Sequence, residues 1–431
     1  MVKPAVIGND GRSSALVAAL LRSPRVKGPV LRLSSGKRSG ADLVDEVVEA
    51  ARTHRPDFVI VGPEGPLADG VVDALRDKLG IPCVGPTREG ARLEWSKAFT
   101  RDLVRRHGIP GNPEYRVFQD REGIEEYCRE LGEFVVKPDG LTGGKGVKVS
   151  GTHLQSRHEA ATYAEEILRA GHPAVVVEER LDGEEFSLQS FCDGSSLADM
   201  VLVQDHKRAH EGDVGPNTGG MGSYSCADHR LPFLTEAQRR EASAINAAVA
   251  AAIARDTGEP YRGILYGGFM LTRQGVRLLE YNVRFGDPEA LNVLSLLRTD
   301  LVDICEAIIG GTLDRLRVES APLATVCKYV VPRGYPDQPV RGEAISLARV
   351  PPESDRLRYY RAAVEETAGG LCLTGSRAIG FVGLGADLDE AEAIAEAAAS
   401  AVEGPVYHRK DIGTRALVQQ RCEHMRRILG R

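Results

Sequence analysis

A lysine at the end of an apolar strand and a second lysine in a glycine-rich loop are the first residues that suggest chemistry. Lys137 belongs to the run Val-Val-Lys-Pro at 135–138, and Lys145 lies in Gly-Leu-Thr-Gly-Gly-Lys-Gly at 140–146. Glycines let such a loop close over a polyphosphate without side-chain clashes, and the two ammonium groups supply positive charge. The pattern is neither GxxxxGK[ST] nor GxGxxG. It therefore indicates phosphate binding by a different kind of loop, with a hairpin of solvated lysines as the alternative.

A group of carboxylates follows the apolar strand expected at 174–179. Glu178 and Glu179 end that strand, and Glu185 comes just after the turn at 182–183. A strand end of this kind offers backbone groups to the edge of a base and carboxylates to an exocyclic amine or to ribose hydroxyls. We interpret these residues as a nucleoside pocket. The alternative is a charged strand end in solvent.

Polar residues alternate with apolar ones in the run Leu-Leu-Glu-Tyr-Asn-Val-Arg at 278–284. Residues two apart on a strand point to one face, so Glu280 and Asn282 can share a hard cation through oxygen ligands. Magnesium fits best, because it bridges phosphate oxygens and neutralises charge during phosphoryl transfer. Arg284 falls on the same face and can donate paired N–H groups to a phosphate or carboxylate. A solvent-facing strand would alternate in the same way, but the loop Arg-Phe-Gly-Asp-Pro-Glu at 284–289 is unusual.

The stretch 204–222 is dense in polar residues and glycines and has few apolar residues. Long connections inside a compact domain are usually functional, so we predict that this stretch lines a substrate site. His206 within it is a candidate for proton transfer. A lone histidine more often positions a neighbouring group, and that alternative stays open.

Alternating strands and helices must position these groups. Apolar strands and helical stretches alternate near the start of the chain, which predicts a parallel sheet covered on both faces. The later segments predict a small α+β lid, a mostly antiparallel core and an accessory α+β domain. The expected fold is therefore an α/β multidomain protein. Its units are an N-terminal Rossmann-like substrate domain at 1–95, a core at 96–114 and 186–315, a lid at 115–185 and a C-terminal accessory domain at 316–431.

Individual elements follow from the periodicity of apolar residues. The pattern predicts one helix over 68–79 and another over 88–107. It predicts a strand over 200–203 and a hairpin that turns at 273–275.

The composition limits the class of protein. The chain has 431 residues, a formal net charge of -6 and charged residues of both signs mixed along it, as in a globular multidomain enzyme. Without a basic face, nucleic acid and anionic membranes are poor partners. No apolar run approaches the ~18 residues of a membrane span, and the eight cysteines are scattered without a CxxC pair. We therefore expect a protein of the cytoplasm.

Seven stretches of the chain resemble the glycinamide ribonucleotide synthetase (phosphoribosylamine-glycine ligase) family, in particular its archaeal members. The pair NTGGMG and RFGDPE is highly specific for this family. The resemblance covers most of the chain from residue 55 onward and implies an ATP-grasp core, with the first domain preceding it. The matching stretches are GPEGPL (62–67), VGPTREGARLEWSKAF (84–99), VVKPDGLTGGKGVKV (135–149), QDHKRAHEGDVGPNTGGMGSYS (204–225), GILYGGFM (263–270), EYNVRFGDPEA (280–290) and GPVYHRKDIGT (404–414).

The resemblance implies that ATP phosphorylates the carboxylate of glycine and that the amine of 5-phosphoribosylamine then attacks the glycyl phosphate. The products are glycinamide ribonucleotide, ADP and phosphate, in de novo purine biosynthesis. It implies Mg²⁺ or Mn²⁺, ATP as co-substrate, small-molecule partners, and a monomer or small homo-oligomer. A closing lid would exclude water from the acyl phosphate.

The resemblance also implies roles for individual residues. Phosphates would be held by Lys97, Lys137 and Lys145, the nucleoside by Glu178, Glu179, Leu181 and Glu185, and the metal by Glu280 and Asn282. Glycine and the acyl phosphate would be oriented by Arg284, Asp205, Asn217, Thr218, Gly219 and Gly220.

The chain departs from the family mainly near its start. The family usually has a GREHA-type turn after the first strand, whereas 8–15 read Gly-Asn-Asp-Gly-Arg-Ser-Ser-Ala, and Ser-Ser-Gly-Lys-Arg-Ser-Gly stands at 34–40 near the place of a Pro-Gly-Asn-like loop. Hydroxyls at a helix N-terminus beside cations still suit a phosphate. Milder departures are Gly268, where archaeal relatives tend to have Gln, and Leu291, where Met or Gln is frequent. The candidate residues for the amine substrate are Gly11, Arg12, Ser13, Ser14, Lys37, Arg38 and Glu64.

Two other functions are compatible with the sequence. One is a ligase with the same machinery and a different amine acceptor, which the departures near the start would explain. The other is a non-catalytic nucleotide-binding homologue. The retained lysines, Glu280 and Asn282 argue against the second.

Overall fold

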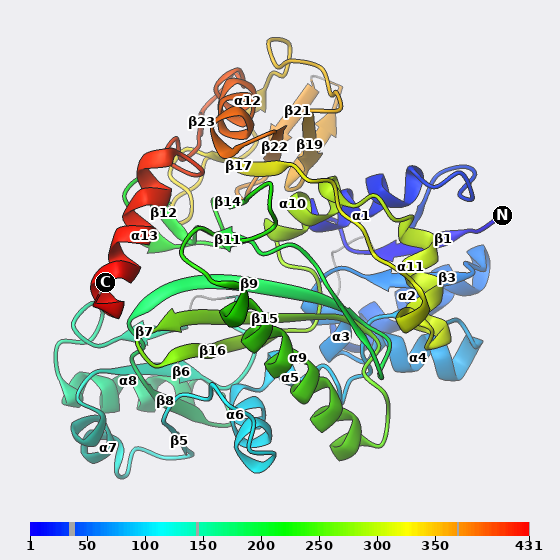
Figure 1. Ribbon diagram of the computed structural model, residues 1–431. Helices are drawn as coiled ribbons and strands as arrows, with labels where there is room; N and C mark the ends of the chain where they lie inside the picture. The colour runs from blue at the N-terminus through cyan, green and yellow to red at the C-terminus, as the bar shows by residue number, and fades with distance from the viewer. Residues whose placement is uncertain (34–38, 144–145, 369, 431) are drawn as a thin grey trace.

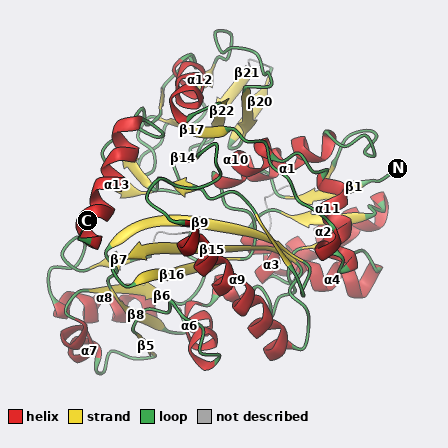
Figure 2. Ribbon diagram, in the orientation of Figure 1, coloured by secondary structure: helices red, strands yellow, loops and turns green. Residues whose placement is uncertain are grey.

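The protein forms several sheets that lie around two long central strands, β9 (Gly183–Cys192) and β15 (Gly263–Thr272). In Figure 1 the N-terminal sheet lies at the right, the sheet of the lid at the lower left and the C-terminal sheet at the top, and Figure 2 shows how helices cover them. Among the described residues, no helix is long and apolar enough to cross a bilayer. The computed structural model describes residues 1–33, 39–143, 146–368 and 370–430.

The N-terminal sheet is parallel, with strand order β2-β1-β3-β4. Its central strands β1 and β3 are buried along their whole length, as expected for a sheet covered on both faces, so this prediction is confirmed. The helix predicted over 68–79 is present but begins later, at Val71, because Asp69 and Gly70 separate it from a preceding short helix that ends at Ala68. The elements are β1 (Pro4–Ile7), α1 (Gly11–Leu21), β2 (Leu31–Arg32), α2 (Gly40–His54), β3 (Phe58–Val61), α3 (Glu64–Ala68), α4 (Val71–Leu79) and β4 (Cys83–Val84).

The helix predicted over 88–107 is two helices, α5 (Arg92–Trp95) and α6 (Lys97–Arg106). Ser96 separates them in an extended conformation, and its hydroxyl accepts a backbone N–H from the first turn of α6 at 3.1 Å. Such an N-cap stabilises the start of a helix. The apolar period runs through the break, so periodicity alone did not reveal it. The cap makes Lys97 the first residue of α6.

The lid is an antiparallel sheet with strand order β5-β8-β6-β7 and two helices against it. Its apolar residues form a cluster separate from the main core, with Phe118, Tyr127, Val136 and Val177 among its members. A core of its own lets this part of the chain pack as a unit. The elements are β5 (Tyr115–Phe118), α7 (Ile124–Leu131), β6 (Phe134–Pro138), β7 (Lys148–Val149), α8 (Arg157–Arg169) and β8 (Val175–Glu179).

The central sheet is antiparallel, with strand order β10-β9-β15-β16, and contains the predicted hairpin. The strand predicted over 200–203 is wrong, because this segment connects two short strands, β10 and β11, and belongs to neither. Val201, Leu202 and Val203 are buried as part of the core instead, and Met200 is half-buried. The remaining elements of this part are β10 (Leu197–Asp199), α9 (Glu236–Thr257), β16 (Gly275–Asn282), α10 (Glu289–Leu296), α11 (Leu301–Gly310) and the 3₁₀ helix Leu313–Arg315.

The C-terminal sheet incorporates strands from the polar stretch 204–222. The order β11-β14-β17-β22-β19 joins β11 and β14 to strands that lie a hundred residues or more further along the chain. The polar stretch is therefore supported by the C-terminal part of the protein. The elements are β11 (Gln204–Asp205), β12 (Arg208–His210), β13 (Val214–Asn217), β14 (Gly222–Ser225), β17 (Ala324–Pro332), β18 (Ala344–Ile345), β19 (Leu357–Arg361), β20 (Val364–Thr367), β21 (Gly370–Leu373), β22 (Ile379–Gly385), α12 (Leu388–Ser400), β23 (Val406–Tyr407) and α13 (Arg415–Leu429).

Helix α12 packs directly on this sheet because both surfaces are small. A Cβ atom at Gly383 of β22 would lie 2.0 Å from the carbonyl oxygen of Ala391. Only glycine tolerates so close an approach of helix and strand backbones. The alanine-rich sequence of α12 thus allows this helix to pack closely on the sheet.

Candidate active site

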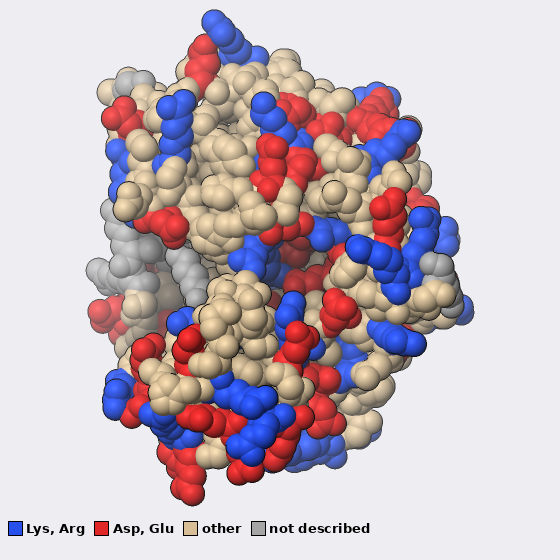
Figure 3. Space-filling view, turned by 90° about the vertical axis from the view of Figure 1, so that its left-hand side faces the viewer, with Lys and Arg blue, Asp and Glu red and all other residues tan. Residues whose placement is uncertain are grey.

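A charged cavity of about 270 Å³ lies where the N-terminal sheet, the lid, the central sheet and the C-terminal sheet meet. Figure 3 shows a hollow on one face in which Lys or Arg and Asp or Glu side chains gather. Twelve residues predicted from the sequence line the cavity. They are Arg12, Glu64, Lys97, Lys137, Glu178, Asp205, Asn217, Thr218, Gly219, Glu280, Asn282 and Arg284.

Two of the predicted phosphate-binding lysines enter the cavity from different elements. Lys97 starts α6, and its Nζ donates to the carbonyl oxygen of Gly140 at 2.9 Å. Lys137 lies on β6, and its Nζ is 2.7 Å from Glu178 Oε2. Burial lowers the pKa of Lys97, a change that the carboxylate of Glu280 opposes. Lys145 lies outside the described residues.

Glu178 is buried and has both carboxylate oxygens occupied. Nε and Nη2 of Arg101 donate to them at 2.7 and 3.0 Å, and the same guanidinium donates to Leu279 O of β16 at 2.7 Å. Burial acts to raise the pKa of Glu178, but Arg101 and Lys137 outweigh it and lower that pKa to about 2. Glu178 therefore positions Lys137 and connects the lid to the central sheet.

The other predicted nucleoside residues do not form part of the cavity wall. Glu179 accepts the backbone N–H of Glu114 at 2.9 Å and pairs with Arg277. Glu185 of β9 lies 3.1 Å from Nζ of Lys207, which does line the cavity. Leu181 is half-buried in the connection between β8 and β9.

The predicted metal ligands Glu280 and Asn282 lie on β16, opposite Gly268 and Tyr266 of β15. Both line the cavity, and the side-chain carboxylate of Glu280 has no hydrogen bond or ion pair within the described residues. Desolvation favours a higher pKa for Glu280, but three surrounding ammonium groups hold that pKa below its ordinary value. These belong to Lys207, Lys137 and Lys97.

A carboxylate without a protein partner beside an amide oxygen fits a hard divalent cation that takes its other ligands from phosphate and water. The described residues contain no cluster of three or more His, Cys, Asp and Glu suited to a metal. A metal bound by Glu280 and Asn282 would therefore depend on the nucleotide for further ligands.

Arg284 is held by acidic groups from the first hundred residues. Its Nε lies 3.2 Å from Glu64 Oε2 and its Nη2 lies 2.8 Å from Glu94 Oε1, and Nη2 also donates to Asn282 Oδ1 at 2.9 Å. Burial raises the pKa of Glu94 to about 7, with Arg284 opposing the change. Burial also acts to raise the pKa of Glu64, but Arg284 and Arg12 lower it to about 2. This pair of carboxylates fixes the guanidinium next to the candidate metal ligands.

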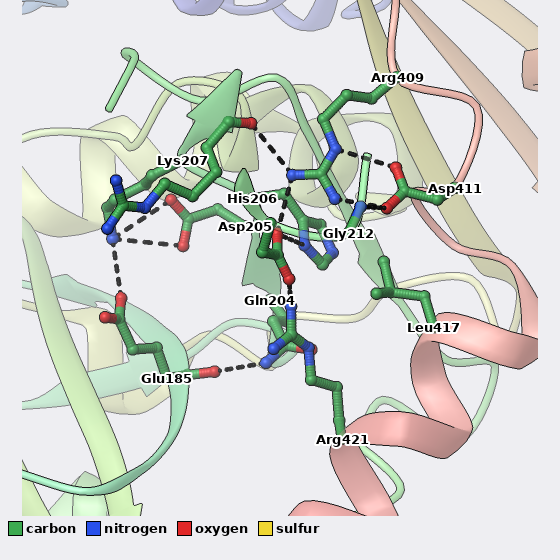
Figure 4. Close-up of polar contacts among 12 residues, drawn as sticks. Glu185, Gln204, Asp205, His206, Lys207, Gly212, Arg409, Asp411, Leu417 and Arg421 are labelled. Carbon is green, nitrogen blue, oxygen red and sulfur yellow. Dashed lines mark hydrogen bonds and ion pairs between the residues drawn. The ribbon is translucent and has the colours of Figure 1, made fainter. Parts of the chain in front are cut away.

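The polar stretch brings Asp205 and Lys207 to the cavity together. Their side chains lie 3.3 Å apart, as Figure 4 shows with Glu185 on the other side of Lys207. Burial raises the pKa of Asp205 to about 6, Lys207 opposes the change, and Glu289 adds to it. Thr218 donates its N–H and hydroxyl to Lys207 O at 2.7 and 2.9 Å. The loop that follows is therefore attached to the Lys207 backbone.

His206 lies outside the cavity wall, which disfavours proton transfer to a substrate there. Its side chain is 1% exposed, stacks on Tyr224 and has its Nδ1 3.7 Å from Asp213. Burial lowers its pKa. Nearby, the buried Arg409 pairs with Asp213 and Asp411 at 2.8 and 2.7 Å, as Figure 4 illustrates for Asp411. These contacts fasten the polar stretch to the C-terminal segment.

Three of the residues predicted for the amine substrate, Arg12, Ser13 and Ser14, are already bonded to other groups of the protein. Nε of Arg12 donates to Asp10 at 2.7 Å, and its Nη1 donates to Phe285 O at 3.0 Å. The hydroxyl of Ser13 donates to Asp10 at 2.6 Å, and that of Ser14 donates to Arg361 O at 2.6 Å. Gly11 starts α1 beside the hydroxyl of Tyr329 and does not line the cavity, and Lys37 and Arg38 lie outside the described residues.

Several residues of the site had no role in the sequence prediction, among them the charged residues Glu94, Arg101, Lys207, Asp287 and Arg377. Lys207 and Asp287 stand inside motifs that were recognised, so proximity to predicted residues was a usable signal. Glu94 also stands inside a recognised motif, at 84–99, whereas Arg101 and Arg377 carried no comparable signal, because their partners lie far away in the sequence. Predicted Gly220 does not itself line the cavity, although its neighbour Gly219 does.

Solved enzymes share this arrangement of sheets. Phosphoribosylamine-glycine ligase from Thermotoga maritima is 26% identical, with a TM-score of 0.77 over 95% of this chain and 100% of that one. The biotin carboxylase domain of Hydrogenobacter thermophilus 2-oxoglutarate carboxylase is 15% identical, with a TM-score of 0.71 over 99% of this chain and 94% of that one, which shows the fold alone. The fold and the charged cavity define an ATP-grasp protein.

Family models resolve the class further. Three domain models of phosphoribosylglycinamide synthetase match this chain: the N domain matches residues 2–94, the ATP-grasp (A) domain matches residues 95–290, and the C domain matches residues 325–415. Phosphoribosylamine-glycine ligase of Methanocella arvoryzae is 45% identical over 100% of both chains. That of Methanocaldococcus jannaschii is 44% identical over 99% of this chain and 100% of the relative. This chain belongs to the phosphoribosylglycinamide synthetase family.

Proposed function

We propose that this protein ligates glycine to 5-phosphoribosylamine at the expense of ATP. The products are glycinamide ribonucleotide, ADP and phosphate, in de novo purine biosynthesis. The observation that carries the proposal is the single cavity that collects Lys97, Lys137, Glu280, Asn282 and Arg284. Full-length relatives named for this activity support it. The same proposal includes the cytoplasm as the compartment, a monomer or small homo-oligomer as the assembly, and the domain limits given above.

In the first step, a carboxylate oxygen of glycine attacks the γ-phosphorus of ATP and the bond to ADP breaks. Lys97 and Lys137 bind phosphate oxygens, together with Lys145, and Glu280 and Asn282 hold Mg²⁺ or Mn²⁺. The bound cation supplies neutralisation of charge on the phosphate oxygens. Glu280 suits this role because its carboxylate has no protein partner in the described part of the chain, and the nearby lysines lower its pKa and so keep it ionised.

In the second step, the amine nitrogen of phosphoribosylamine attacks the carbonyl carbon of glycyl phosphate. The carbon–oxygen bond to phosphate breaks, phosphate leaves, and the attacking nitrogen loses a proton. Arg284 and the donors of 217–220 orient the acyl phosphate, and Asp205 with Lys207 orients glycine. Oriented donors stabilise the negative charge that develops on the carbonyl oxygen.

We place the nucleoside against the backbone of 179–181. Glu178 then acts through Lys137, and Glu185 acts through Lys207, because each carboxylate pairs with that lysine at the cavity wall. The amine substrate is placed next to Arg12 and Glu64, which line the cavity beside α1. We also assign Gly11, Ser13, Ser14, Lys37 and Arg38 to the acceptor side, with Ser13 and Ser14 acting through the shape that their bonded hydroxyls give it rather than by contact with the substrate.

The proposal is tested by incubating the purified protein with ATP, Mg²⁺, glycine and freshly generated phosphoribosylamine. We expect glycinamide ribonucleotide by mass detection in equal amount to ADP, and no product when any one substrate is omitted. ADP formation without that product, under conditions where phosphoribosylamine is intact, would contradict the proposed acceptor.

A second candidate is a ligase of the same chemistry with another amine acceptor. The observation in its favour is that the hydroxyls of Ser13 and Ser14 are already bonded inside the protein. Glycine-dependent ADP release that responds to a different amine and ignores phosphoribosylamine would establish it.

A further inference from the structure

Arg377 joins the two most distinctive loops of the site from a third part of the chain. It lies between β21 and β22, in the C-terminal segment, and its side chain is 14% exposed at the cavity wall. Its Nη1 donates to the carbonyl oxygens of Gly219, Gly220 and Asp287 at 2.7, 3.0 and 2.8 Å. One nitrogen therefore connects the 217–220 loop to the 284–289 loop.

The plane of the Arg377 guanidinium is fixed on both sides. Its Cζ lies 4.5 Å from the ring centroid of Tyr329, which is a cation–π distance. A Cβ atom at Gly219 would lie 3.2 Å from the same Cζ and 3.3 Å from Nη2. Glycine at 219 therefore lets the loop backbone lie close against the guanidinium.

The hydrogen-bond acceptors and donors of the 217–220 loop differ in their partners. The carbonyl oxygens of Gly219 and Gly220 accept hydrogen bonds from Arg377. The backbone N–H of Gly220 donates to Thr218 Oγ1 at 3.0 Å. Within the described residues, the N–H of Gly219 and the side-chain amide of Asn217 have no hydrogen-bond partner, and both residues line the cavity. The loop thus keeps its free donors on residues at the cavity and its acceptors at Arg377.

We propose that Arg377 is a positioning residue, which holds the donors of the 217–220 loop in place around the acyl phosphate, so that less of this intermediate is lost to hydrolysis before ligation. The inference rests on the proposed function, because it concerns the fate of the glycyl phosphate formed there. Donors help a reaction only when they are fixed where charge develops, and displacement by about 1 Å costs on the order of 100-fold in rate.

A matched control is available in the same segment. Arg341 donates its Nη1 to Thr374 O at 2.8 Å and lies against Gly375, where a Cβ atom would be 2.7 Å from its Cζ. It repeats the contact of a guanidinium with a carbonyl and a glycine, but it does not line the cavity. Arg341→Gln therefore removes a similar structural contact without touching the site.

The test compares Arg377→Gln and Arg377→Lys with wild type and Arg341→Gln. Hydroxylamine traps an acyl phosphate as a hydroxamate whatever the natural acceptor is, so hydroxamate formed per ADP released measures how much acyl phosphate escapes hydrolysis. We expect Arg377→Gln to lower kcat by about 10- to 100-fold and to lower this ratio, with KM for ATP close to wild type. The melting temperature should fall as well, because three carbonyl oxygens lose a donor. Arg377→Lys recovers part of the ratio, and Arg341→Gln keeps the wild-type ratio.

Gly219→Ala is a second variant that leaves Arg377 in place and displaces the loop from it. We expect it to lower the hydroxamate ratio in the same direction. If Arg377→Gln and Gly219→Ala both keep the wild-type ratio, the inference is wrong, even if kcat and stability are lower in these variants. Wild-type protein that forms hydroxamate but no glycinamide ribonucleotide would refute the proposed acceptor, and the comparison of ratios would still decide the role of Arg377.

Discussion

The two ends of the cavity differ in how their polar groups are bonded. After their proposed roles, we call the end with Lys97, Lys137 and Glu280 the nucleotide end and the end with Arg12 and Glu64 the acceptor end. At the nucleotide end, Glu280 has no protein partner within the described residues and Lys97 has only a carbonyl oxygen. At the acceptor end, Arg12 is bonded to Asp10 and Phe285, and the hydroxyl of Ser13 is bonded to Asp10. The first end combines internal pairs, such as Lys137 with Glu178, with a carboxylate that is open to a ligand, whereas the second bonds its groups internally.

This difference separates ligand-binding groups from groups that shape the site. A charged side chain that lines a cavity without a protein partner has its hydrogen-bonding positions open to a ligand, so such a group marks a candidate binding position. A group that is already bonded has to give up that bond before it binds anything else. The nucleotide end should therefore be sensitive to substitution of the unpartnered groups, and the acceptor end should be sensitive mainly through its geometry.

The largest effect, on the free energy of unfolding, is expected at Arg101, which supports Glu178 at the nucleotide end. Arg101→Met leaves Glu178 buried with one partner fewer, which should reduce the free energy of unfolding by about 3–5 kcal/mol. Denaturant unfolding measures this, with Arg105→Met on the exposed side of the same helix as the control. An unchanged midpoint would mean that Arg101 and Glu178 are not a buried pair in solution.

The same pair has a defined dependence on pH. Because the pKa of Glu178 is lowered from 4.5 to about 2 in the folded protein, its stabilising contribution is present above pH 4.5 and is lost as the pH falls towards about 2. Wild type should lose stability over this interval more steeply than Arg101→Met. Parallel acid unfolding curves would argue against the assigned pairing.

Substitution of the unpartnered carboxylate should come next in size. Glu280→Gln keeps the shape of the side chain and removes its charge, so we expect kcat to fall by about 100-fold or more with little change in melting temperature. Glu130→Gln, at an exposed lid carboxylate, is the control. Steady-state rates over a range of Mg²⁺ concentrations provide the measurement. Full activity at limiting Mg²⁺ would remove Glu280 from the metal site.

A smaller effect is expected from Asp205, between the two ends. Burial raises its pKa to about 6, so the carboxylate that pairs with Lys207 is lost as the pH falls below that value. We expect KM for glycine to rise by up to about tenfold per pH unit below pH 6. Asp205→Asn should have a higher KM that no longer varies with pH in this range. The same acid limb in Asp205→Asn would assign the titration to another group.

The smallest effects should come from the acceptor hydroxyls. Ser13→Ala removes a bond to Asp10, and we expect it to cost about 1 kcal/mol in stability and to leave KM for phosphoribosylamine within about twofold. Ser14→Ala should behave similarly. Unfolding curves and initial rates at varied phosphoribosylamine measure both quantities. A rise in KM of tenfold or more in either variant would show that these hydroxyls bind the substrate and would remove the contrast between the two ends.

Local patterns predicted the elements that present groups to the cavity. The alternation at 280–284 brought Glu280 and Asn282 to one side of β16, and the parallel N-terminal sheet followed from alternating strands and helices. The local pattern failed where a polar residue ended an element inside a continuous apolar period, as Ser96 does between α5 and α6.

Residues that support the predicted ones were not accessible to the same reasoning. Arg101 meets Glu178 from 77 residues away, and Arg377 meets Gly219 from 158 residues away. These pairs meet because the sheets pack against one another, and the periodicity of apolar residues within a single element carries no information about that packing. The resemblance to a family supplied the expected ligands of the cavity, but these supporting arginines emerged only from the three-dimensional arrangement.

The long reach of Arg377 bears on the order in which the protein becomes competent during synthesis. Translation proceeds from the N-terminus, so the lysines and carboxylates of the nucleotide end leave the ribosome well before residue 377. A nascent chain that ends before this residue lacks the contact that fastens the 217–220 loop. Full coupling of ATP cleavage to ligation is therefore a property of the finished polypeptide, and incomplete chains are poorly equipped to use ATP productively.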